Sequence, residues 1–285
     1  MKGFFGKLIG FLLNVFLGLA ILAGLAVAWG IGFEPGRVRV SEPRMALAGI
    51  PSSWPPLKIA VLSDLHIGSP HIDVKKLEEI VETVNGLKPD IILLLGDFTP
   101  DVFFRSNIPP ATFAPVLGKL KAKYGIAAIL GEHDMRGDTR ALLGALKKAG
   151  IPVLVNRAIR IELANKRNLW IAGLASTGPD YARAAAKVPK KAPVLVLVHN
   201  PAAFSDIPLN VTAVFAGHTH GGLIDLPELG PLILVKDTPR RFTRGIIRED
   251  AKVMFVTTGI GTGAYPIRIN NPPEIALVTI GAVPN

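Results

Sequence analysis

Histidines and aspartates gather at the ends of apolar runs in this sequence. Five of the six histidines directly follow a stretch with strand character, at positions 66, 133, 199, 218 and 220. Asp64 in "VLSDLH" and Asp97 in "LLLGDF" occupy the same kind of position. Because open α/β sheets bind ligands at the edge where their strands end, this pattern predicts that these side chains meet in one site.

The spacing inside two of these blocks suits metal coordination. Asp64 and His66 lie two residues apart, as do His218 and His220, so in extended chain each pair points to one side. The chain has no cysteine. Carboxylate and imidazole donors without thiolates favour Mn, Fe or Zn, particularly as two ions about 3.5–4 Å apart that activate a water. Each block alone is weak, since a single histidine such as His199 is more often a buried structural residue.

The ordered combination of blocks is far more specific than any one of them. The motifs D-x-H, GD, G-x-H-D, H and GHTHGG follow one another within residues 57–280, and in this order they resemble the calcineurin-like metallophosphoesterases. "SDLHIG", "GHTHGG" and "TTGIGTGAYPIRINNPPEI" resemble most the membrane-anchored or exported bacterial branch of that family. The resemblance implies a phosphoesterase with two divalent metal ions (Mn, Fe or Zn). Such an enzyme hydrolyses phosphodiester or pyrophosphate bonds with a hydroxide that bridges the metals.

The resemblance also implies roles for individual residues. Seven side chains would hold the two metals: Asp64, His66, Asp97 and His220 the first, and Asp97, Glu132, His199 and His218 the second. His133 would stabilise or protonate the leaving oxygen, and Asp134 would orient that imidazole, although a plain turn residue is an equal alternative for Asp134. We expect substrate contacts from Arg268 and from His71, whose segment is equally typical of a solvated loop.

Glu132 is the one metal-ligand position at which the sequence departs from the family pattern. The pattern at this block is G-N-H-D/E, whereas this chain has "GEHD". A carboxylate in place of a neutral amide lowers the positive charge of the site, which should tighten metal binding and weaken the attraction for anionic phosphate. A working enzyme with altered metal preference, a slowed enzyme and an inactive relative are all compatible with this change. We favour the working enzyme, because the other ligands and His133 are intact.

The elements that must position these residues alternate along the first half of the chain. Buried strands are expected over 58–62, 90–95 and 125–130, and amphipathic helices over 74–87, 112–123 and 138–150. The second half is richer in apolar runs of strand character, including 192–198, 211–216, 231–235, 252–258 and 275–280. We therefore expect an α/β fold, a four-layer α/β/β/α sandwich of two packed mixed sheets with flanking helices.

The N-terminus predicts one transmembrane helix over residues 1–33. Residues 8–33 carry no charge, and at about 1.5 Å per residue they exceed a hydrocarbon core of about 30 Å. A retained single-pass anchor is favoured over a cleaved signal peptide, the alternative that "AVA" at 26–28 allows. Basic residues flank the run on both sides, so orientation stays open, with an extracytoplasmic catalytic domain favoured. Five prolines within 34–56 predict a linker, followed by a metallophosphoesterase domain over 57–285.

The net charge of +10 indicates anionic partners. Together with the anchor, it favours a lipid-linked or nucleotide-sugar-lipid phosphoester of the membrane or envelope. Nucleic acid is disfavoured, because aromatic residues do not interleave with the basic ones. The basic run 239–248 is either a solvated loop or a patch for anionic lipid headgroups or a polyanionic substrate. The alternative function is a non-catalytic, metal-containing module that binds an anionic envelope ligand.

Overall fold

The apolar runs of the N-terminal half and the last strand of the chain form one six-stranded sheet. The computed structural model describes residues 2–100, 108–263 and 265–283. The strands of this first sheet are β1 (Arg39–Ser41), β2 (Arg44–Leu47), β3 (Leu57–Leu62), β4 (Ile91–Leu94), β5 (Ile126–Ala128) and β14 (Glu274–Ala282). They run in the order β1-β14-β3-β4-β5, with β2 also paired to β14. β3, β4 and β5 are parallel, so their carboxyl ends share one edge, and β14 is antiparallel to β3.

The second six-stranded sheet comes from the strand-rich second half. Its order is β12-β13-β9-β8-β7-β6. The strands are β6 (Arg157–Leu163), β7 (Arg167–Gly173), β8 (Val194–Leu197), β9 (Ala213–Ala216), β12 (Gly245–Glu249) and β13 (Lys252–Val256). The four central strands are parallel, and the two edge strands are antiparallel to their neighbours. A separate short pair consists of β10 (Asp225–Leu226) and β11 (Gly230–Pro231).

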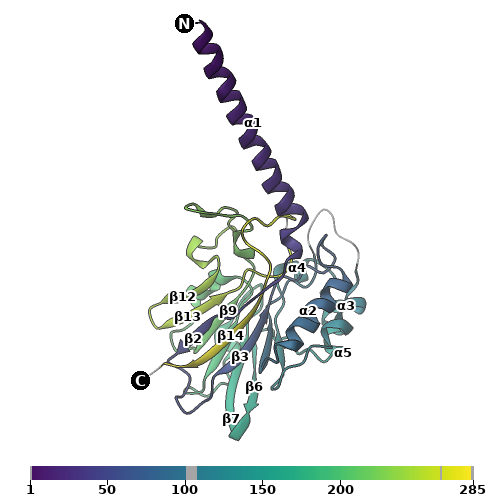
Figure 1. The fold of residues 1–285 in the computed structure, drawn as a ribbon. Coiled ribbons are helices and arrows are strands. Elements are labelled where there is room, and N and C mark those ends of the chain that lie inside the picture. Colours follow the sequence, from purple (N-terminus) through teal and green to yellow (C-terminus); the bar gives the residue numbers. More distant parts are fainter. Residues whose placement is uncertain (1, 101–107, 264, 284–285) are drawn as a thin grey trace.

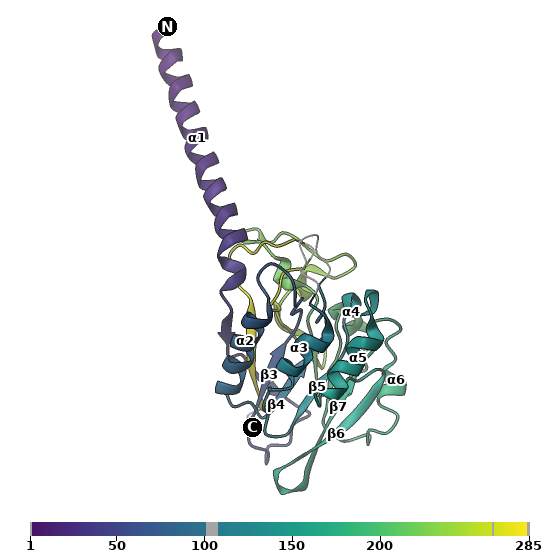
Figure 2. The same cartoon turned by 90° about the vertical axis from the view of Figure 1, so that its right-hand side faces the viewer.

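The two sheets pack face to face, and helices cover their outer faces. A core of aliphatic and aromatic side chains from both sheets, including Ile59, Leu93, Phe215 and Phe255, fills the space between them. α2 (Val74–Gly86), α3 (Pro110–Leu117) and α5 (Thr139–Lys148) cover the first sheet (Figure 2). Shorter turns cover the second sheet: α6 (Tyr181–Ala184) and the 3-10 segments η3 (Pro201–Asp206) and η5 (Arg240–Phe242). The predicted α/β/β/α sandwich of two mixed sheets is confirmed.

Two of the predicted helices start where the sequence places a capping aspartate. The side chain of Asp73 accepts a hydrogen bond from Lys76 N at the start of α2, and Asp138 accepts one from Ala141 N at the start of α5. Such caps satisfy amide groups that have no partner inside the helix. The remaining short segments are α4 (Glu132–Arg136), η1 (Glu34–Gly36), η2 (Ala164–Lys166) and η4 (His220–Gly222).

Two expectations about organisation were wrong. Residues 34–56 are not a free linker, because β1 and β2 lie in this range and pair in parallel with β14. All five prolines of this range lie outside the two strands, so none of them removes a donor from the pairing with β14. The apolar run 231–235 is not a buried strand either: β11 ends at Pro231, and Leu232 and Leu234 are exposed.

α1 (Lys2–Gly32) projects from one end of the sandwich (Figure 1). It is long and apolar enough to cross a membrane, by length and composition. Its base is fixed to the domain, since Arg268 N donates to Gly30 O at 2.9 Å and a side chain at Gly30 would collide with Ile269. α1 therefore leaves the domain from a defined position.

Candidate metal centre

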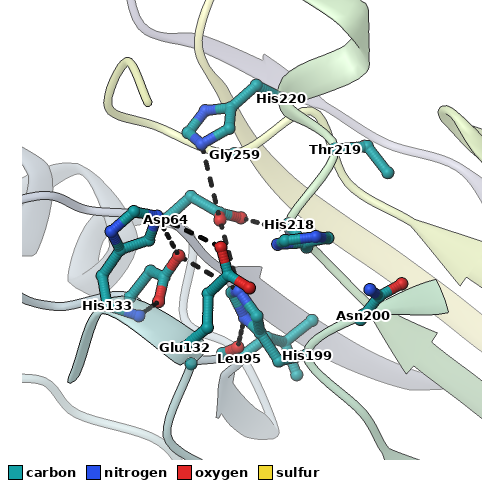
Figure 3. A network of polar contacts seen from close by, with 12 residues as sticks. Asp64, Leu95, Glu132, His133, His199, Asn200, His218, Thr219, His220 and Gly259 are labelled. Carbon is teal, nitrogen blue, oxygen red and sulfur yellow. Dashed lines mark hydrogen bonds and ion pairs between the residues drawn. The ribbon is translucent and has the colours of Figure 1, made fainter. Parts of the chain in front are cut away.

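The predicted metal ligands meet at the shared edge of the two sheets (Figure 3). Each follows the carboxyl end of a parallel strand, as the sequence pattern predicted. Their donor atoms form two groups, within each of which all lie within 4.8 Å of one another: Asp64 with His66 and His220, and Asp97 with His199 and His218. All six residues are buried.

The first group presents imidazole lone pairs to a common point. His66 Nδ1 lies 3.1 Å from Thr99 O, and His220 Nδ1 lies 3.3 Å from Gly261 O. Because a carbonyl oxygen only accepts, each Nδ1 carries the proton and each Nε2 presents a lone pair. The two Nε2 atoms are 3.2 Å apart. Two facing lone pairs repel unless a cation lies between them, so this arrangement fits a metal ion.

Burial favours the neutral form of both rings. It is the largest influence on His66 and on His220, lowering the pKa of both, that of His220 to about 3. A neutral imidazole is the form that coordinates a metal. The first group is therefore ready to bind without losing a proton at neutral pH.

The two aspartates each use one oxygen to fix their orientation. Asp64 Oδ2 accepts a hydrogen bond from His218 N at 2.9 Å, while Asp64 Oδ1 is buried and makes no hydrogen bond to any residue that the structure describes. Asp97 Oδ1 accepts from His133 N at 2.9 Å, and Oδ2 lies 3.1 Å from His199 Nε2 and 3.8 Å from His66 Nε2. Asp97 thus faces both groups, which is the position that the expected bridging role requires.

His199 differs from the other ligands in its protonation. Its Nδ1 lies 2.7 Å from Leu95 O, and its Nε2 faces Asp97. Burial alone would lower its pKa, but the neighbouring charges of Asp97 and Asp64 raise it to about 10. In return the pKa of Asp97, which burial would raise, is held below its usual range by His199 and His66. Without a metal, these two side chains form a buried ion pair.

The backbone around these ligands is unusual. Asp64, His66, Asp97, His218 and His220 all have φ between 43° and 71°, in the left-handed region that non-glycine residues rarely adopt. Such conformations persist where the surrounding structure enforces them, and they cluster at functional sites. The ligand loops are therefore held in place by the sheets beneath them.

Glu132 and His133 lie at the start of α4, at the mouth of the site. Glu132 Oε1 is 3.5 Å from His133 Nε2 and 3.7 Å from Arg136, and its side chain is 39% exposed. His133 Nε2 is 3.8 Å from Asp97 Oδ2, and its ring is only 12% exposed. Gly131 precedes them because the Asp97 carboxylate occupies the space of a side chain at that position. Glu132 points into the centre (Figure 3), although it is not part of the two tight groups among the described residues.

The described hydrogen bonds of Asp134 point to a supporting role. Its carboxylate accepts from Thr99 N, Thr99 Oγ1 and Gly131 N, at 3.0–3.1 Å. Thr99 in turn provides the carbonyl that fixes the His66 ring. Burial, followed by the charge of Asp97, raises the pKa of Asp134 to about 6. The expected contact with the His133 ring stays a prediction.

Arg268 is not a substrate contact, which corrects the expectation from the sequence. It is fully buried, and its guanidinium makes five hydrogen bonds to four backbone carbonyls: Thr258, Gly259, Gly261 and Asn271. Burial lowers its pKa to about 10, which leaves it charged at neutral pH. The Gly261 carbonyl also accepts from His220 Nδ1, so Arg268 supports a metal ligand from behind.

His71 also lies away from its expected position. It is half-buried and hydrogen-bonds the backbone of Ile31 near the end of α1. Burial, the largest influence, lowers its pKa. The structure places this histidine at the anchor rather than in the substrate pocket.

A pocket of about 290 Å³ opens beside the metal groups. One wall is polar and includes Asp97, Glu132, His133, His218 and His220. The other wall is mostly apolar and was missed by the sequence reasoning: Leu223, Ile233, Leu234, Val235 and Tyr265. The hydrophobicity of the run 231–235 could have indicated this wall, but it was interpreted as that of a strand.

The basic run 239–248 is largely paired. Arg241 forms an ion pair with Glu249, Arg244 pairs with Asp225, and the Arg240 guanidinium donates to Leu229 O. These contacts reduce the charge that the run offers to an anionic partner, and they tie it to neighbouring loops.

A two-sheet sandwich with paired Asp/His groups at the strand ends defines a metal-dependent phosphoesterase. The family model described as calcineurin-like phosphoesterase matches residues 57–222, and the chain belongs to that family. Calcineurin-like phosphoesterases use two divalent metals, and the two groups described above could bind them.

Curated relatives match almost the whole chain. The metallophosphoesterase YkuE of Bacillus subtilis (strain 168) is 30% identical over 98% of this chain and 96% of its own length. The phosphodiesterase YaeI of Escherichia coli (strain K12) is 31% identical over 92% of this chain and 96% of its own. A Danio rerio transmembrane protein with metallophosphoesterase domain is 28% identical over 93% of this chain and 62% of its own.

Proposed function

We propose that this chain hydrolyses phosphodiester or pyrophosphate bonds of substrates linked to the membrane or envelope. The observation that carries the proposal is the pair of buried Asp/His groups with Asp97 between them. When bound there, two divalent ions (Mn, Fe or Zn) supply Lewis-acid activation of a phosphoryl group and of water. The phosphodiesterase activity named for the Escherichia coli relative supports the reaction class.

The chain's own residues orient the site and handle the proton. The backbone bonds to Asp64 and Asp97 leave one oxygen of each carboxylate aimed at the centre. His133 borders the pocket, and its Nε2 lies close to Asp97 without being enclosed. In this proposal His133 is the general acid that delivers a proton to the leaving oxygen.

The location forms part of the same proposal. α1 is retained as a single-pass anchor, and the phosphoesterase domain lies on the extracytoplasmic side. A phosphoester that is part of a lipid or of a nucleotide-sugar-lipid is then within reach of the site. The length and composition of α1 support the anchor.

Turnover of bis-p-nitrophenyl phosphate with Mn, Zn or Fe tests the reaction. For a dialkyl phosphodiester, whose alkoxide leaving group needs a proton, we expect His133→Ala to lower kcat by about 10²–10⁴-fold, the range of general acid–base catalysis, with metal content unchanged. For bis-p-nitrophenyl phosphate, whose p-nitrophenolate leaves without a proton, we expect a much smaller loss. His71→Ala is the matched control, because the same substitution at the base of α1 should leave turnover intact. A metal-loaded protein that turns over no phosphoester would instead support a non-catalytic module for an anionic envelope ligand.

A further inference from the structure

Large apolar side chains are exposed around the mouth of the metal pocket. Leu229, Leu232, Leu234 and Tyr265 are 61%, 46%, 40% and 58% exposed, and together we call them the apolar rim. Leu234 and Tyr265 also line the pocket itself. A soluble surface rarely keeps such a cluster beside a polar active site without a partner that covers it.

The rim is held in a fixed conformation. Leu232 N donates to Ile224 O at 2.8 Å, and Ile233 N donates to Gly222 O at 3.1 Å. The Arg240 guanidinium donates to Leu229 O. These bonds let Ile233 and Val235 face the pocket while Leu232 faces outward. The backbone hydrogen bonds therefore hold the leucine side chains toward solvent, where exposed apolar area is unfavourable.

The rim lies at the end of the domain from which α1 emerges. The loop of residues 223–244 and the described parts of a second loop, residues 259–263 and 265–273, rise beside the last turns of α1 (Figures 1 and 2). The second loop contacts the end of α1 through Arg268 N to Gly30 O, and it contacts the following η1 through Asn271 N to Glu34 at 2.6 Å. Tyr265 lies only three residues before Arg268, so this rim residue belongs to the loop that holds the anchor.

The base of α1 has the composition of a membrane–water interface. Trp29 and Phe33 stack with ring centroids 5.5 Å apart, and Arg37 lies over the Trp29 ring. Trp is enriched where an apolar span meets the headgroups, and basic side chains near a helix end reach toward them. The surface of the bilayer therefore passes close to residues 29–37, next to the loop that carries Tyr265.

We infer that the apolar rim is a second membrane-contacting surface, which enters the bilayer face from which α1 emerges. With four apolar side chains in the headgroup region, the metal pocket opens onto the membrane surface. This inference rests on the proposed function, and it assigns the site to phosphoesters carried by membrane lipids. The apolar part of such a lipid stays in the leaflet while its phosphoester group reaches the metals. The bilayer is favoured over a protein partner because α1 already fixes this end of the domain next to it.

The absence of cysteine allows a direct test with single labels in the full-length chain. Leu229→Cys and Leu232→Cys carry an environment-sensitive fluorophore in vesicles of phosphatidylcholine and phosphatidylglycerol. We expect blue-shifted emission and quenching by lipids with a nitroxide near the headgroup. Leu209→Cys is the matched control, since Leu209 is 59% exposed and precedes β9, at the opposite end of the sheet. Quenching at the rim no greater than at Leu209 overturns the inference, as does a blue shift that occurs without lipid quenching, which would indicate a protein on the rim.

Two substrates with one leaving group separate this inference from the proposed function. Bis-p-nitrophenyl phosphate is soluble, whereas the p-nitrophenyl ester of phosphatidic acid resides in the vesicle; in both, water adds to phosphorus and p-nitrophenolate leaves. We expect Leu229→Glu and Leu232→Glu each to lower turnover of the lipid ester about tenfold, because an apolar side chain that would enter the bilayer is lost, and to leave turnover of the soluble ester unaffected. If wild type cleaves neither ester, the proposed function fails. The lipid-quenching experiment still decides whether the apolar rim contacts the bilayer. Equal turnover of the lipid ester by wild type and both variants counts against the rim.

Discussion

At the residue scale, the short segment Gly131–Asp134 combines three different tasks. Gly131 makes room for the Asp97 carboxylate, and Asp134 fixes the loop through Thr99. His133 borders the pocket where a leaving group can be protonated. Glu132 stands among them with a negative charge 3.5 Å from the His133 ring, at the position where the family pattern has asparagine. Its charge therefore acts on both the metals and an incoming phosphate.

Glu132→Asn should maintain or raise phosphodiesterase activity. Removing one negative charge from the mouth lowers repulsion of the phosphodiester by about 1 kcal/mol, which corresponds to a KM about fivefold lower. Steady-state kinetics with bis-p-nitrophenyl phosphate at saturating metal measures this change.

Glu132→Gln is the control that separates charge from length, because it keeps the longer side chain as a neutral amide. Equal gains in both variants assign the effect to charge. Loss of turnover in both variants shows that the carboxylate is required. The hypothesis that an amide at position 132 supports catalysis at least as well as Glu132 is then wrong.

The two metal groups should also differ in the protons that they release. His199 has a pKa of about 10 in the metal-free protein, so at pH 7 a metal must displace its proton from Nε2. His66 and His220 have lowered pKa values and are already neutral at that pH. One metal should therefore bind with release of about one proton and the other with none.

The sign of this effect gives a pH dependence that can be measured. Between pH 6.5 and about 10, the affinity of the Asp97–His199–His218 group for a metal ion should rise about tenfold per pH unit, because protons compete less with the metal for His199 Nε2. Affinity at the other group should stay level over the same window. Isothermal titration calorimetry in two buffers of different ionisation enthalpy counts the protons; the same count for both equivalents contradicts this assignment.

At the element scale, the loop over 257–273 connects the anchor to the metal centre. Glu34 accepts hydrogen bonds from Trp29 Nε1 and from Asn271 N, and Asn271 Nδ2 donates to His220 O at 2.7 Å. Arg268 connects the same loop to the carbonyl that fixes the His220 ring. The base of α1 and a metal ligand therefore share one buried polar network, and such networks are sensitive to the loss of any member.

Arg268→Lys should destabilise this network despite the conserved charge. Lysine offers three donors on a flexible stem and cannot reproduce the planar fork that serves four carbonyls. We expect a loss of about 3 kcal/mol in the free energy of unfolding, together with reduced metal occupancy at the His220 group. Denaturant titration in detergent and metal analysis measure the two effects. Arg248→Lys, on the exposed face of β12, is the matched control and should stay within about 0.5 kcal/mol of wild type.

The positions of the metal ligands were predictable from the sequence for a physical reason. Parallel strands bring their carboxyl ends to one edge, so residues that follow neighbouring strands, such as Asp64 after β3 and Asp97 after β4, must approach one another, and the packing of the two sheets adds His199 after β8. The alternation of strands and helices then requires the helices to cover the sheet, as α2, α3 and α5 do. Periodicity and topology together were sufficient for both inferences.

What the sequence could not indicate depends on partners far away in the chain. The run 231–235 has the composition of a buried strand, and only its position beside the metal groups makes it a pocket wall. Arg268 has the chemistry of a phosphate ligand, but it is fully buried and its guanidinium binds the carbonyls of Thr258, Gly259, Gly261 and Asn271. β1 and β2 lie in a proline-rich segment and become strands because β14 offers them a free edge. In each case tertiary contacts override the local pattern.

At the scale of the whole molecule, α1 emerges at one end of the domain, where the carboxyl ends of the central parallel strands carry the metal ligands, and the amino ends of those strands lie at the other end (Figure 1). Under the proposed function, this layout directs the site toward the surface of the membrane that holds α1 and away from the bulk solution. The net charge of +10 adds attraction toward anionic lipid. Whether α1 remains attached decides if this arrangement persists in the mature protein.

Retention of α1 can be tested directly. The contacts of Trp29, Gly30 and Glu34 with the domain lie after the "AVA" segment at 26–28, so cleavage there would leave them in place, and docking alone does not distinguish an anchor from a signal peptide. We expect the protein to resist extraction from membranes by salt and alkali, to dissolve in detergent, and to keep its full mass of 30.3 kDa. Leu17→Lys combined with Leu22→Lys should weaken insertion, because each lysine near the helix centre costs about 2.5–3.5 kcal/mol, whereas the same pair of changes to alanine should not release the protein. A product that lacks residues 1–28 and is released by salt would show that α1 is a signal peptide.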